Sequence, residues 1–392
     1  MTKKSKKKIC VFTGTRAEYG LLRPLMEEVR KDKAFKLQIV ASAMHLLPEF
    51  GSTYKEIERD GLKIDEKVKI FLEDDTPVGI NRSVSSAILK LSKAFVKLKP
   101  DMVVILGDRF EAFSAATAAM IWRIPIAHIN GGEATFGVID EAIRHSITKM
   151  SHLHFTSTDE YRKRVIQLGE QPDRVFNVGA TGLDSIKRMK FLSKKDLEKE
   201  LSFKFAKRNL LVTFHPVTLE KGTSKKQFGN LLNVLDSLKG THIIFTMANA
   251  DTEGRIINKM IDKYVAKRPY KSKAFISMGQ RKYLSTMQFV DAVVGNSSSG
   301  IIEAPSFKIG TVNIGDRQKG RIRTESIIDC SPRKEDIKKA IRKLYTPEFQ
   351  KTLKRIKSPY GDGSASKRIA KIIKTVKGLL LKKEFYNIRW RI

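Results

Sequence analysis

Three carboxylates stand at positions in this chain where proton-transfer chemistry could take place. Asp108 follows a short apolar run, Glu133 follows a second run and a Gly-Gly turn, and Asp140 begins a helical pattern. Arg144 and His145 come four and five residues after Asp140. Carboxylates are common general acids and bases in enzymes. If the fold brings these side chains together, they form a candidate catalytic cluster.

The elements that must position these residues alternate between strand and helix. Residues 103–106 and 124–129 have the continuous apolar character of strands buried on both faces. Residues 111–121 and 140–150 have the length and composition of helices. Such an alternation predicts a parallel sheet, and ligands bind at the carboxyl edge of open parallel sheets. The three carboxylates are therefore expected at one edge.

The same alternation continues through the chain and predicts a doubly wound α/β fold. Residues 83–98 are expected to form a helix, preceded by an exposed loop at 73–81. A lysine-rich stretch at 184–209 separates the two halves, and a strand at 210–214 restarts the pattern. We predict an N-terminal Rossmann-like domain at 1–184, a nucleotide-binding Rossmann-like domain at 185–363, and a C-terminal helix that packs back, with a basic tail, at 364–392.

Two turns have the character of anion sites. Arg16 lies in a glycine-containing turn between a strand at 8–13 and a helix, where it could meet a phosphate. The segment Gly-Asn-Ser-Ser-Ser-Gly at 295–300 opens a second helix with hydroxyl and backbone N–H groups. An ordinary helix cap would also explain either turn.

Composition limits the class of protein. The chain has 392 residues, 41% of them hydrophobic, and a run long enough to cross a membrane is missing from the sequence. Two cysteines and no signal sequence indicate a cytoplasmic protein. The formal charge of +33 would suit a nucleic-acid-binding protein, but the basic residues are interspersed with acids, and zinc-finger and RNA-binding aromatic motifs are missing. We favour a lysine-rich surface together with a site for an anionic small molecule, and we expect no specific nucleic acid and no membrane as partner.

Several segments together resemble the hydrolysing UDP-N-acetylglucosamine 2-epimerases of sialic and legionaminic acid biosynthesis. They are VFTGTRAEYG, GDRFEA, GGEATFGVIDEAIRHSITKMSHLHF and GNSSSGIIE, supported by FHPVT and NIGDRQKGR. The resemblance implies a GT-B-like fold, with two Rossmann-type domains whose parallel sheets face each other across a cleft. It implies conversion of UDP-N-acetylglucosamine to N-acetylmannosamine and UDP through a 2-acetamidoglucal. It also implies that neither a metal nor another cofactor is needed, and that the chain forms a homodimer or homotetramer.

The resemblance also implies roles for individual residues. The acid/base positions of the family fall on Asp108 and Asp140, and a third, usually glutamate, falls on Asn130. Because an amide cannot exchange a proton at neutral pH, Glu133 is the candidate for that role, and Asn130 is expected to bind substrate. His145 is expected to be the partner of a site carboxylate. The remaining substrate-binding candidates are Arg16, Arg109, His215, Ser297, Ser298, Glu303 and Arg317, most of them near the diphosphate, with Glu303 on the ribose.

Alternatives remain at this point. The same reaction could act on UDP- or GDP-linked N,N'-diacetylbacillosamine, because GGEATFG and VIQLGEQPDRVFNVG resemble the legionaminic-type branch. A GT-B glycosyltransferase, a non-hydrolysing epimerase and a nucleic-acid-binding protein are further possibilities. A metal site made of His128, Glu133 and Asp140 is the least favoured.

Overall fold

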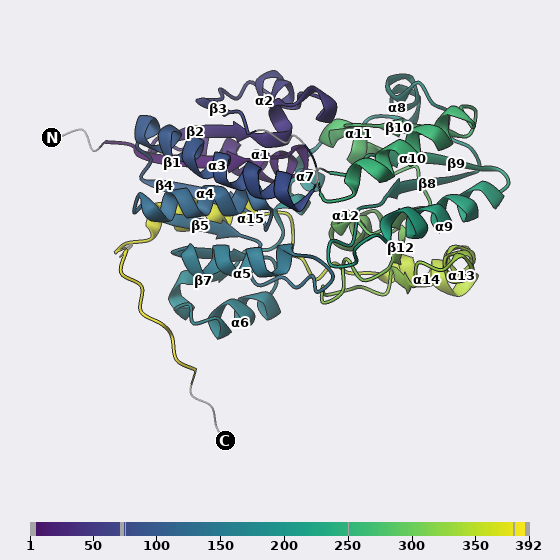
Figure 1. The fold of residues 1–392 in the computed structure, drawn as a ribbon. Helices are drawn as coiled ribbons and strands as arrows, with labels where there is room; N and C mark the ends of the chain where they lie inside the picture. Colours follow the sequence, from purple (N-terminus) through teal and green to yellow (C-terminus); the bar gives the residue numbers. More distant parts are fainter. Residues whose placement is uncertain (1–4, 71–73, 75, 250, 379–380, 389–392) are drawn as a thin grey trace. The chain divides into compact units, whose positions relative to one another are not determined.

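The computed structural model describes residues 5–70, 74, 76–249, 251–378 and 381–388. The chain divides into two compact units. The first unit comprises Met1–Glu133, Asp140–Lys187 and Tyr360–Ile392, and the second comprises Ala134–Ile139 and Arg188–Pro359. Each unit contains one parallel sheet covered by helices, which confirms the expected α/β class (Figure 1).

The sheet of the first unit has seven parallel strands in the order β3-β2-β1-β4-β5-β6-β7. The central strands are short runs of apolar residues that are buried on both faces, as expected for a parallel sheet. The strands are β1 (Lys7–Thr13), β2 (Phe35–Ser42), β3 (Glu66–Val68), β4 (Met102–Leu106), β5 (Ile126–Ile129), β6 (Leu153–Thr156) and β7 (Val175–Asn177).

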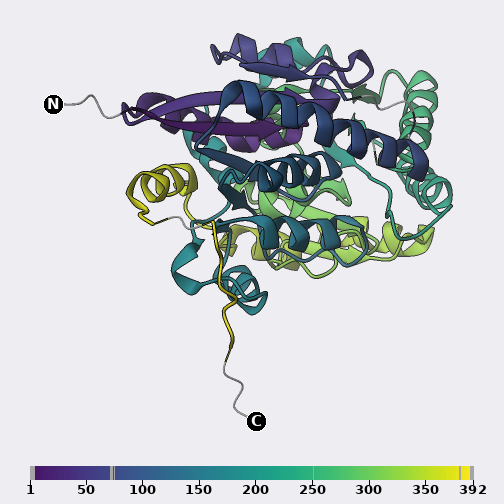
Figure 2. The same cartoon turned by 60° about the vertical axis from the view of Figure 1, so that its left-hand side comes forward.

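Helices cover both faces of this sheet and bury two apolar clusters against it (Figure 2). The helices are α1 (Arg16–Lys31), α2 (Tyr54–Arg59), α3 (Pro77–Leu98), α4 (Phe110–Ile121), α5 (Asp140–Met150), α6 (Asp159–Gln167), α7 (Thr181–Arg188) and α15 (Ala365–Thr375). Short 3₁₀ turns are η1 (Ala43–Leu46), η2 (Pro48–Phe50) and η3 (Pro172–Arg174).

The start of α3 corrects the expected loop at 73–81. The helix begins at Pro77 rather than at residue 83, with Thr76 as its N-cap accepting a hydrogen bond from the backbone N–H of Gly79. Proline is well suited to the first helical position because that residue needs no intrahelical donor. Residues 71–73 and 75, which belong to the expected loop, lie outside the described residues.

Helix α15 returns from the far end of the chain to the first unit. The buried Asp184 carboxylate accepts hydrogen bonds from the backbone N–H groups of Ala365 (2.8 Å) and Ser366 (2.6 Å). Those groups lie at the start of α15, where backbone donors have no partner within the helix. The helix packs against α1 and buries Ile369 and Ile373.

The second unit repeats this architecture with six parallel strands in the order β10-β9-β8-β11-β12-β13. The strands are β8 (Arg208–Thr213), β9 (Thr241–Thr246), β10 (Ser272–Phe275), β11 (Ala292–Gly295), β12 (Gly310–Ile314) and β13 (Ile327–Cys330). The helices are α8 (Lys194–Leu201), α9 (Ser224–Ser237), α10 (Gly254–Ala266), α11 (Gly279–Thr286), α12 (Ser298–Ile302), η4 (Ala304–Phe307), α13 (Lys334–Leu344) and α14 (Pro347–Arg355).

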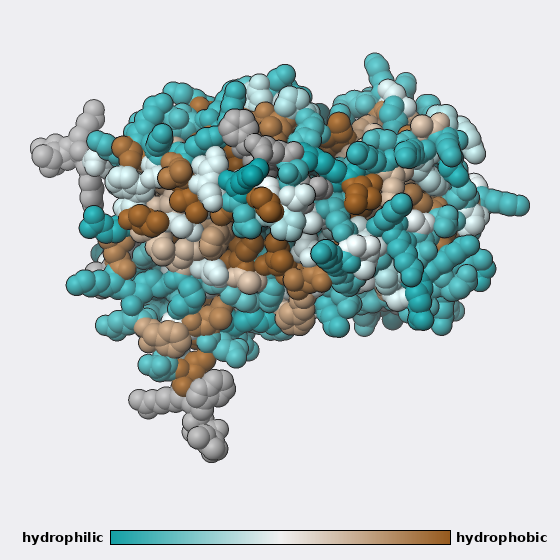
Figure 3. Space-filling model, in the orientation of Figure 1, coloured by the Kyte–Doolittle hydropathy of each residue, from teal (hydrophilic) through white to brown (hydrophobic). Residues whose placement is uncertain are grey.

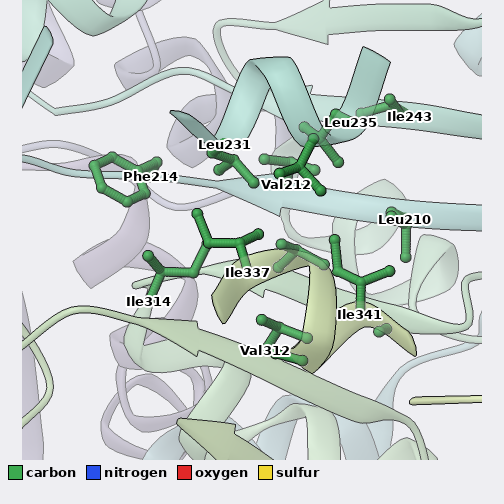
Figure 4. Packing of buried hydrophobic residues seen from close by; sticks show 14 of the residues in the cluster. Leu210, Val212, Phe214, Leu231, Leu235, Ile243, Val312, Ile314, Ile337 and Ile341 are labelled. Carbon is green, nitrogen blue, oxygen red and sulfur yellow. The ribbon is translucent and has the colours of Figure 1, made fainter. Parts of the chain in front are cut away.

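The core of the second unit lies between its sheet and the covering helices. Figure 4 shows Leu231 and Leu235 of α9 on one side of the sheet residue Val212, with Ile337 and Ile341 of α13 nearby. Hydrophilic side chains cover much of the face drawn in Figure 3, in keeping with 75 lysine and arginine residues. Among the described residues, the helices are too short or too polar to cross a membrane.

Part of the loop between β5 and α5, residues 134–139, belongs to the second unit. The backbone N–H of Phe136 donates to the Lys319 carbonyl oxygen (3.0 Å), and that of Ile139 donates to the Thr218 hydroxyl (3.0 Å). Leu219 N–H donates to the Gly137 carbonyl oxygen (3.3 Å). Residues 134–139 are therefore packed as part of the second unit, although the elements on either side of them belong to the first.

Candidate active site

Arg144 is the centre of the carboxylate cluster in the first unit. Its side chain is only 1% exposed. One guanidinium nitrogen is bound to the Asp108 carboxylate, while another contacts Glu141 Oε2 at 2.6 Å and the Glu133 carbonyl oxygen at 2.9 Å. Burial by itself would lower the pKa of Arg144, but the charges of Asp108 and Glu133 outweigh it and raise the pKa above its usual value. This arginine stays charged and holds the cluster together.

The expected carboxylates differ in access. The Asp108 side chain is 21% exposed, whereas Glu133 is 2% exposed and its carboxylate accepts a hydrogen bond from the Ser157 hydroxyl (3.2 Å). Asp140 is partly exposed as the first residue of α5. Asp108 and Asp140 can therefore reach a ligand more easily than Glu133, which is placed to compensate the charge of Arg144.

Glu141 was missed in the sequence analysis. Its side chain is 22% exposed and contacts Arg144 at one oxygen and His145 Nε2 at the other (3.0 Å). The carboxylate that His145 contacts in the structure is that of Glu141. The spacings of three and four residues between Glu141 and its partners are those that bring side chains together on a helix, and this signal could have identified it.

His128 fixes the turn that carries Asp108. Its Nε2 lies 2.8 Å from the Gly107 carbonyl oxygen, and its Nδ1 lies 3.1 Å from the Thr148 hydroxyl. Burial lowers the pKa of His128 to about 3, so the ring is neutral. Nε2–H must then donate to the carbonyl, and Nδ1 accepts from Thr148. Both nitrogens are occupied, so His128 is not placed to hold a metal with Glu133 and Asp140.

Asn130 has an unusual backbone conformation and a buried side-chain oxygen. Its φ angle of 68° lies in the left-handed region, which asparagine adopts more easily than most residues. Its N–H donates to the Phe155 carbonyl oxygen at 2.9 Å. Within the described part of the chain, the buried Oδ1 has no hydrogen-bond partner. An unpaired buried acceptor at the carboxyl end of β5 is suited to a donor group of a ligand.

The two arginines of the first unit that are expected to bind substrate have different surroundings. Arg16 is the first residue of α1 and is partly exposed, directly after the Thr15 N-cap. Arg109 is paired with the fully buried Glu111, at 3.2 Å between Nε and Oε2. This ion pair holds the turn after Asp108. Arg16 lies at the start of a helix, where backbone N–H groups and the helix dipole favour an anion.

In the second unit, Asn296 joins three of the expected binding residues. Its side chain accepts from the His215 N–H (2.7 Å) and donates to the His215 carbonyl oxygen (2.8 Å). The Asn296 carbonyl oxygen accepts from Arg317 (3.2 Å) and from Gln318 (2.9 Å). Ser297 follows directly as the N-cap of α12. Asn296 is completely buried and was missed because its role depends on partners remote in sequence.

The close approach of β11 to β8 explains the glycine before Asn296. Gly295 has a φ of 132°, and a Cβ atom there would lie 1.9 Å from the Thr213 carbonyl oxygen. Only glycine fits this position. It brings Asn296 and Ser297 to the carboxyl end of β11, and Ser298 begins the five-residue helix α12.

Glu303 terminates α12 and belongs to a short chain of hydroxyl groups. The Tyr283 hydroxyl donates to Ser299 Oγ (2.9 Å), and Ser299 donates to Glu303 Oε2. Burial raises the pKa of Glu303, and the Ser299 hydrogen bond opposes this change. A carboxylate oriented in this way is suited to accept hydrogen bonds from a diol.

The structure thus contains two separate sets of chemical groups. The first unit presents Asp108 and Glu141 in contact with a buried arginine, and the partly exposed Asp140 begins the same helix, α5; these carboxylates are suited to proton transfer. The second presents His215, Arg317 and two serines, which are suited to an anion, with Glu303 beside them. Among the residues that the structure describes, we find no group of three histidine, cysteine or acidic side chains placed to hold a metal ion.

Comparisons with known proteins agree with this description. A sequence model of the family described as UDP-N-acetylglucosamine 2-epimerase matches residues 27–374. A GDP/UDP-N,N'-diacetylbacillosamine 2-epimerase (hydrolyzing) of Campylobacter jejuni is 50% identical over 88% of this chain and 89% of its own. The Polysialic acid biosynthesis protein P7 of Escherichia coli is 40% identical over 97% of this chain and 98% of its own.

Solved structures show the same fold. A UDP-GlcNAc 2-epimerase from Neisseria meningitidis, crystallised bound to UDP-GlcNAc, superposes with a TM-score of 0.80, 20% identity, and coverage of 94% of this chain and 100% of that one. This likeness confirms the GT-B-like class that the sequence predicted. From the match to the family over most of its length and the identity with these relatives, the chain belongs to the hydrolysing branch of the UDP-N-acetylglucosamine 2-epimerase family.

Proposed function

We propose that this chain is a hydrolysing 2-epimerase of a nucleotide-linked N,N'-diacetylbacillosamine, with UDP or GDP as the carrier. The substrate assignment rests on the 50% identity, over most of both chains, with a relative named for that activity. UDP-N-acetylglucosamine, the first choice from the sequence alone, becomes the second candidate. The observation that supports the chemistry is the group of carboxylates around Arg144.

The first half of the reaction removes the C2 proton and the nucleotide. A carboxylate takes the proton from C2, the electron pair of the C–H bond forms a C1=C2 double bond, and the C1–O bond breaks so that the nucleoside diphosphate leaves with its electrons. We assign proton transfer to Asp108 and Asp140 because both can reach a ligand. Glu133 is assigned to charge compensation of Arg144, because its carboxylate is buried.

The second half adds water to the double bond. The water oxygen bonds to C1 and gives up a proton to a carboxylate, while C2 receives a proton on the face opposite to the one that lost it. The product is the free sugar with inverted configuration at C2. Two acid/base groups on opposite faces of the sugar are needed for this inversion, which is why a single carboxylate would not suffice.

The second unit supplies the groups for the leaving nucleotide. A departing diphosphate gains negative charge at the bridging oxygen, and fixed positive charges and N–H donors lower the barrier to that change. We assign His215, Arg317, Ser297 and Ser298 to the diphosphate and Glu303 to the ribose hydroxyls. Arg16 of the first unit is a further candidate for the diphosphate.

The test is a comparison of kcat/KM for UDP-N,N'-diacetylbacillosamine, GDP-N,N'-diacetylbacillosamine and UDP-N-acetylglucosamine, with the sugar product identified. We expect a free 2-epimeric sugar and preference for one of the diacetylated substrates by about tenfold or more, since one buried amide contact is worth about 1–3 kcal/mol. A preference for UDP-N-acetylglucosamine would overturn the substrate assignment. A product that stays attached to the nucleotide would overturn the hydrolytic step.

A further inference from the structure

The segment after α15 lies outside the residues matched by the family, and the proposed reaction uses none of it. The family match ends at residue 374, whereas the structure describes residues 381–388, which we call the strap. Figures 1 and 2 both show the yellow coil beyond α15 passing close to α6. The strap belongs to the first unit, the unit that contains Asp108 and Arg144.

Lys383 anchors the strap by placing its ammonium group in a site lined by three oxygen acceptors. Its Nζ lies 2.7 Å from Glu170 Oε2 and donates to the carbonyl oxygens of Lys149 (2.9 Å) and Ser151. An ammonium has three N–H donors, and all three are accounted for. The Lys149 carbonyl lies in the last turn of α5, where helix carbonyls have no partner within the helix, and Ser151 directly follows the helix.

Glu170 makes this anchor a buried ion network. Its carboxylate is 3% exposed and also accepts from Lys149 Nζ (2.6 Å) and His154 Nε2 (2.9 Å). Burial would raise the pKa of Glu170, but the hydrogen bonds from His154, Lys149 and Lys383 outweigh it and lower the pKa to about 2. The carboxylate is therefore charged at neutral pH and depends on its cationic partners.

Two further contacts hold the rest of the strap in place. The Tyr386 N–H donates to the Gly169 carbonyl oxygen at 2.9 Å, and Gln171 Nε2 donates to the Glu384 carbonyl oxygen at 3.4 Å. The Phe385 ring lies directly over Gly169, where a Cβ atom would come within 2.2 Å of it. The strap is thus fitted to this surface at several points.

Helix α5 connects the anchor with the candidate active site. In its last turn, the Lys149 side chain contacts Glu170 and the Lys149 carbonyl oxygen accepts from Lys383. Thr148 in the same turn donates to His128, which in turn donates to the Gly107 carbonyl oxygen before Asp108. Its first turns carry Glu141 and Arg144. A shift of this one helix would move both the arginine and the support of the Asp108 turn.

We propose that Lys383 is a positioning residue. Through this lysine the strap holds α5 in place, so that Arg144 keeps its contact with Asp108 and His128 supports the turn that carries Asp108. The proposal rests on the proposed function, because the reaction is what the positioning serves. A strap that only stabilises the fold would change the free energy of unfolding and leave turnover by the folded enzyme unchanged.

The experiment compares Lys383→Met with Lys382→Met in the full chain. Lys382 is the adjacent, exposed residue, so both changes remove one positive charge from the same segment. We expect Lys383→Met to lower kcat on the order of tenfold to a hundredfold, with KM changed less than about twofold, since small misplacements of catalytic groups cost rates of this order. Lys382→Met should match the wild type, and Lys383→Arg should recover most of the loss.

Equal kcat for Lys383→Met, Lys382→Met and the wild type would overturn the proposal. Equal losses in both variants would also overturn it, because the effect would then come from charge alone.

If Lys383→Met does not fold, Phe385→Ala replaces it, since Phe385 is 61% exposed and its removal loosens the strap without opening the core. We expect a loss of kcat of about threefold or more, and an unchanged kcat would overturn the proposal.

Amide hydrogen exchange separates this inference from the proposed function. If the wild type turns over none of the three nucleotide sugars, the proposed function fails, while exchange at residues 141–145 still tests the strap. Faster exchange there in Lys383→Met than in Lys382→Met would support positioning of the first turns of α5 by the strap. Equal exchange would overturn it.

Discussion

Replacement of Arg144 by methionine tests the central arrangement of the site most severely. Methionine retains much of the length of the arginine side chain but has no charge and no N–H donor. The change would leave Asp108, Glu133 and Glu141 close together without the cation that now contacts or compensates each of them. Breaking a buried ion pair by removal of one partner costs about 3–5 kcal/mol, because the remaining charge stays buried without compensation.

The partial exposure of two of the carboxylates reduces the expected loss in the free energy of unfolding. Asp108 and Glu141 retain about a fifth of their side-chain surface, so water can solvate them in part, whereas Glu133 cannot be reached. We therefore expect the lower end of the range, a loss of about 3 kcal/mol in the free energy of unfolding at neutral pH. The loss should shrink as the pH is lowered and the carboxylates become protonated.

Urea unfolding followed by tryptophan fluorescence is a suitable assay. Trp122 directly follows α4 in the first unit, so its emission reports on the unit that contains the site. Lys93→Met on the exposed face of α3 also removes one positive charge; it is the control and should change the free energy of unfolding by less than about 0.5 kcal/mol. A loss below about 1 kcal/mol for Arg144→Met would refute the account of Arg144 as the centre of a buried charge cluster.

Three further predictions concern other parts of the molecule. Burial lowers the pKa values of His45 and His128 to about 3, so below pH 6.5 the unfolded chain binds more protons than the folded chain. Each histidine should therefore lower the free energy of unfolding by about 2 kcal/mol at about pH 5, as measured by urea unfolding at a series of pH values. Gly132→Ala should destabilise the first unit by about 2 kcal/mol or more in the same assay, because its φ is 77° and a Cβ would lie 2.3 Å from a backbone carbonyl oxygen. Ser299→Ala removes the donor that opposes the raised pKa of Glu303, so calorimetry should show UDP binding weakened by about 1–2 kcal/mol, more at about pH 6 than at about pH 8. An effect independent of pH would contradict that reasoning.

Much of the fold could be predicted because buried parallel strands have an unambiguous pattern. The run at 103–106 is apolar throughout and lies in β4, and the largely apolar run at 210–214 coincides with β8 up to Thr213. The edge strands β3 and β13 were missed, since they are short and mix charged with apolar residues. The start of α3 was missed because Pro77 was taken for a loop residue rather than the first residue of a helix.

The candidate site was predictable to the extent that topology determines it. Asp108, Glu133 and Arg144 follow strand ends or begin a helix at one edge of a parallel sheet, and the structure brings them together. The sequence alone could not show that Glu133 is buried while Glu141 is accessible, because access depends on packing from remote segments such as Ser157. The same holds for contacts across long separations, of which the anchor of Lys383 on Glu170 is the clearest case.

The most direct measurement is proton NMR of the purified protein in heavy water with UDP-N,N'-diacetylbacillosamine, repeated with the GDP-linked sugar and with UDP-N-acetylglucosamine. The account predicts release of a free 2-epimeric sugar that carries deuterium at C2, together with the nucleoside diphosphate, because the C2 proton is removed and replaced from solvent. An epimerised sugar that retains its proton at C2 would contradict proton transfer by the carboxylates around Arg144. Hydrolysis without change of configuration at C2 would contradict the epimerase.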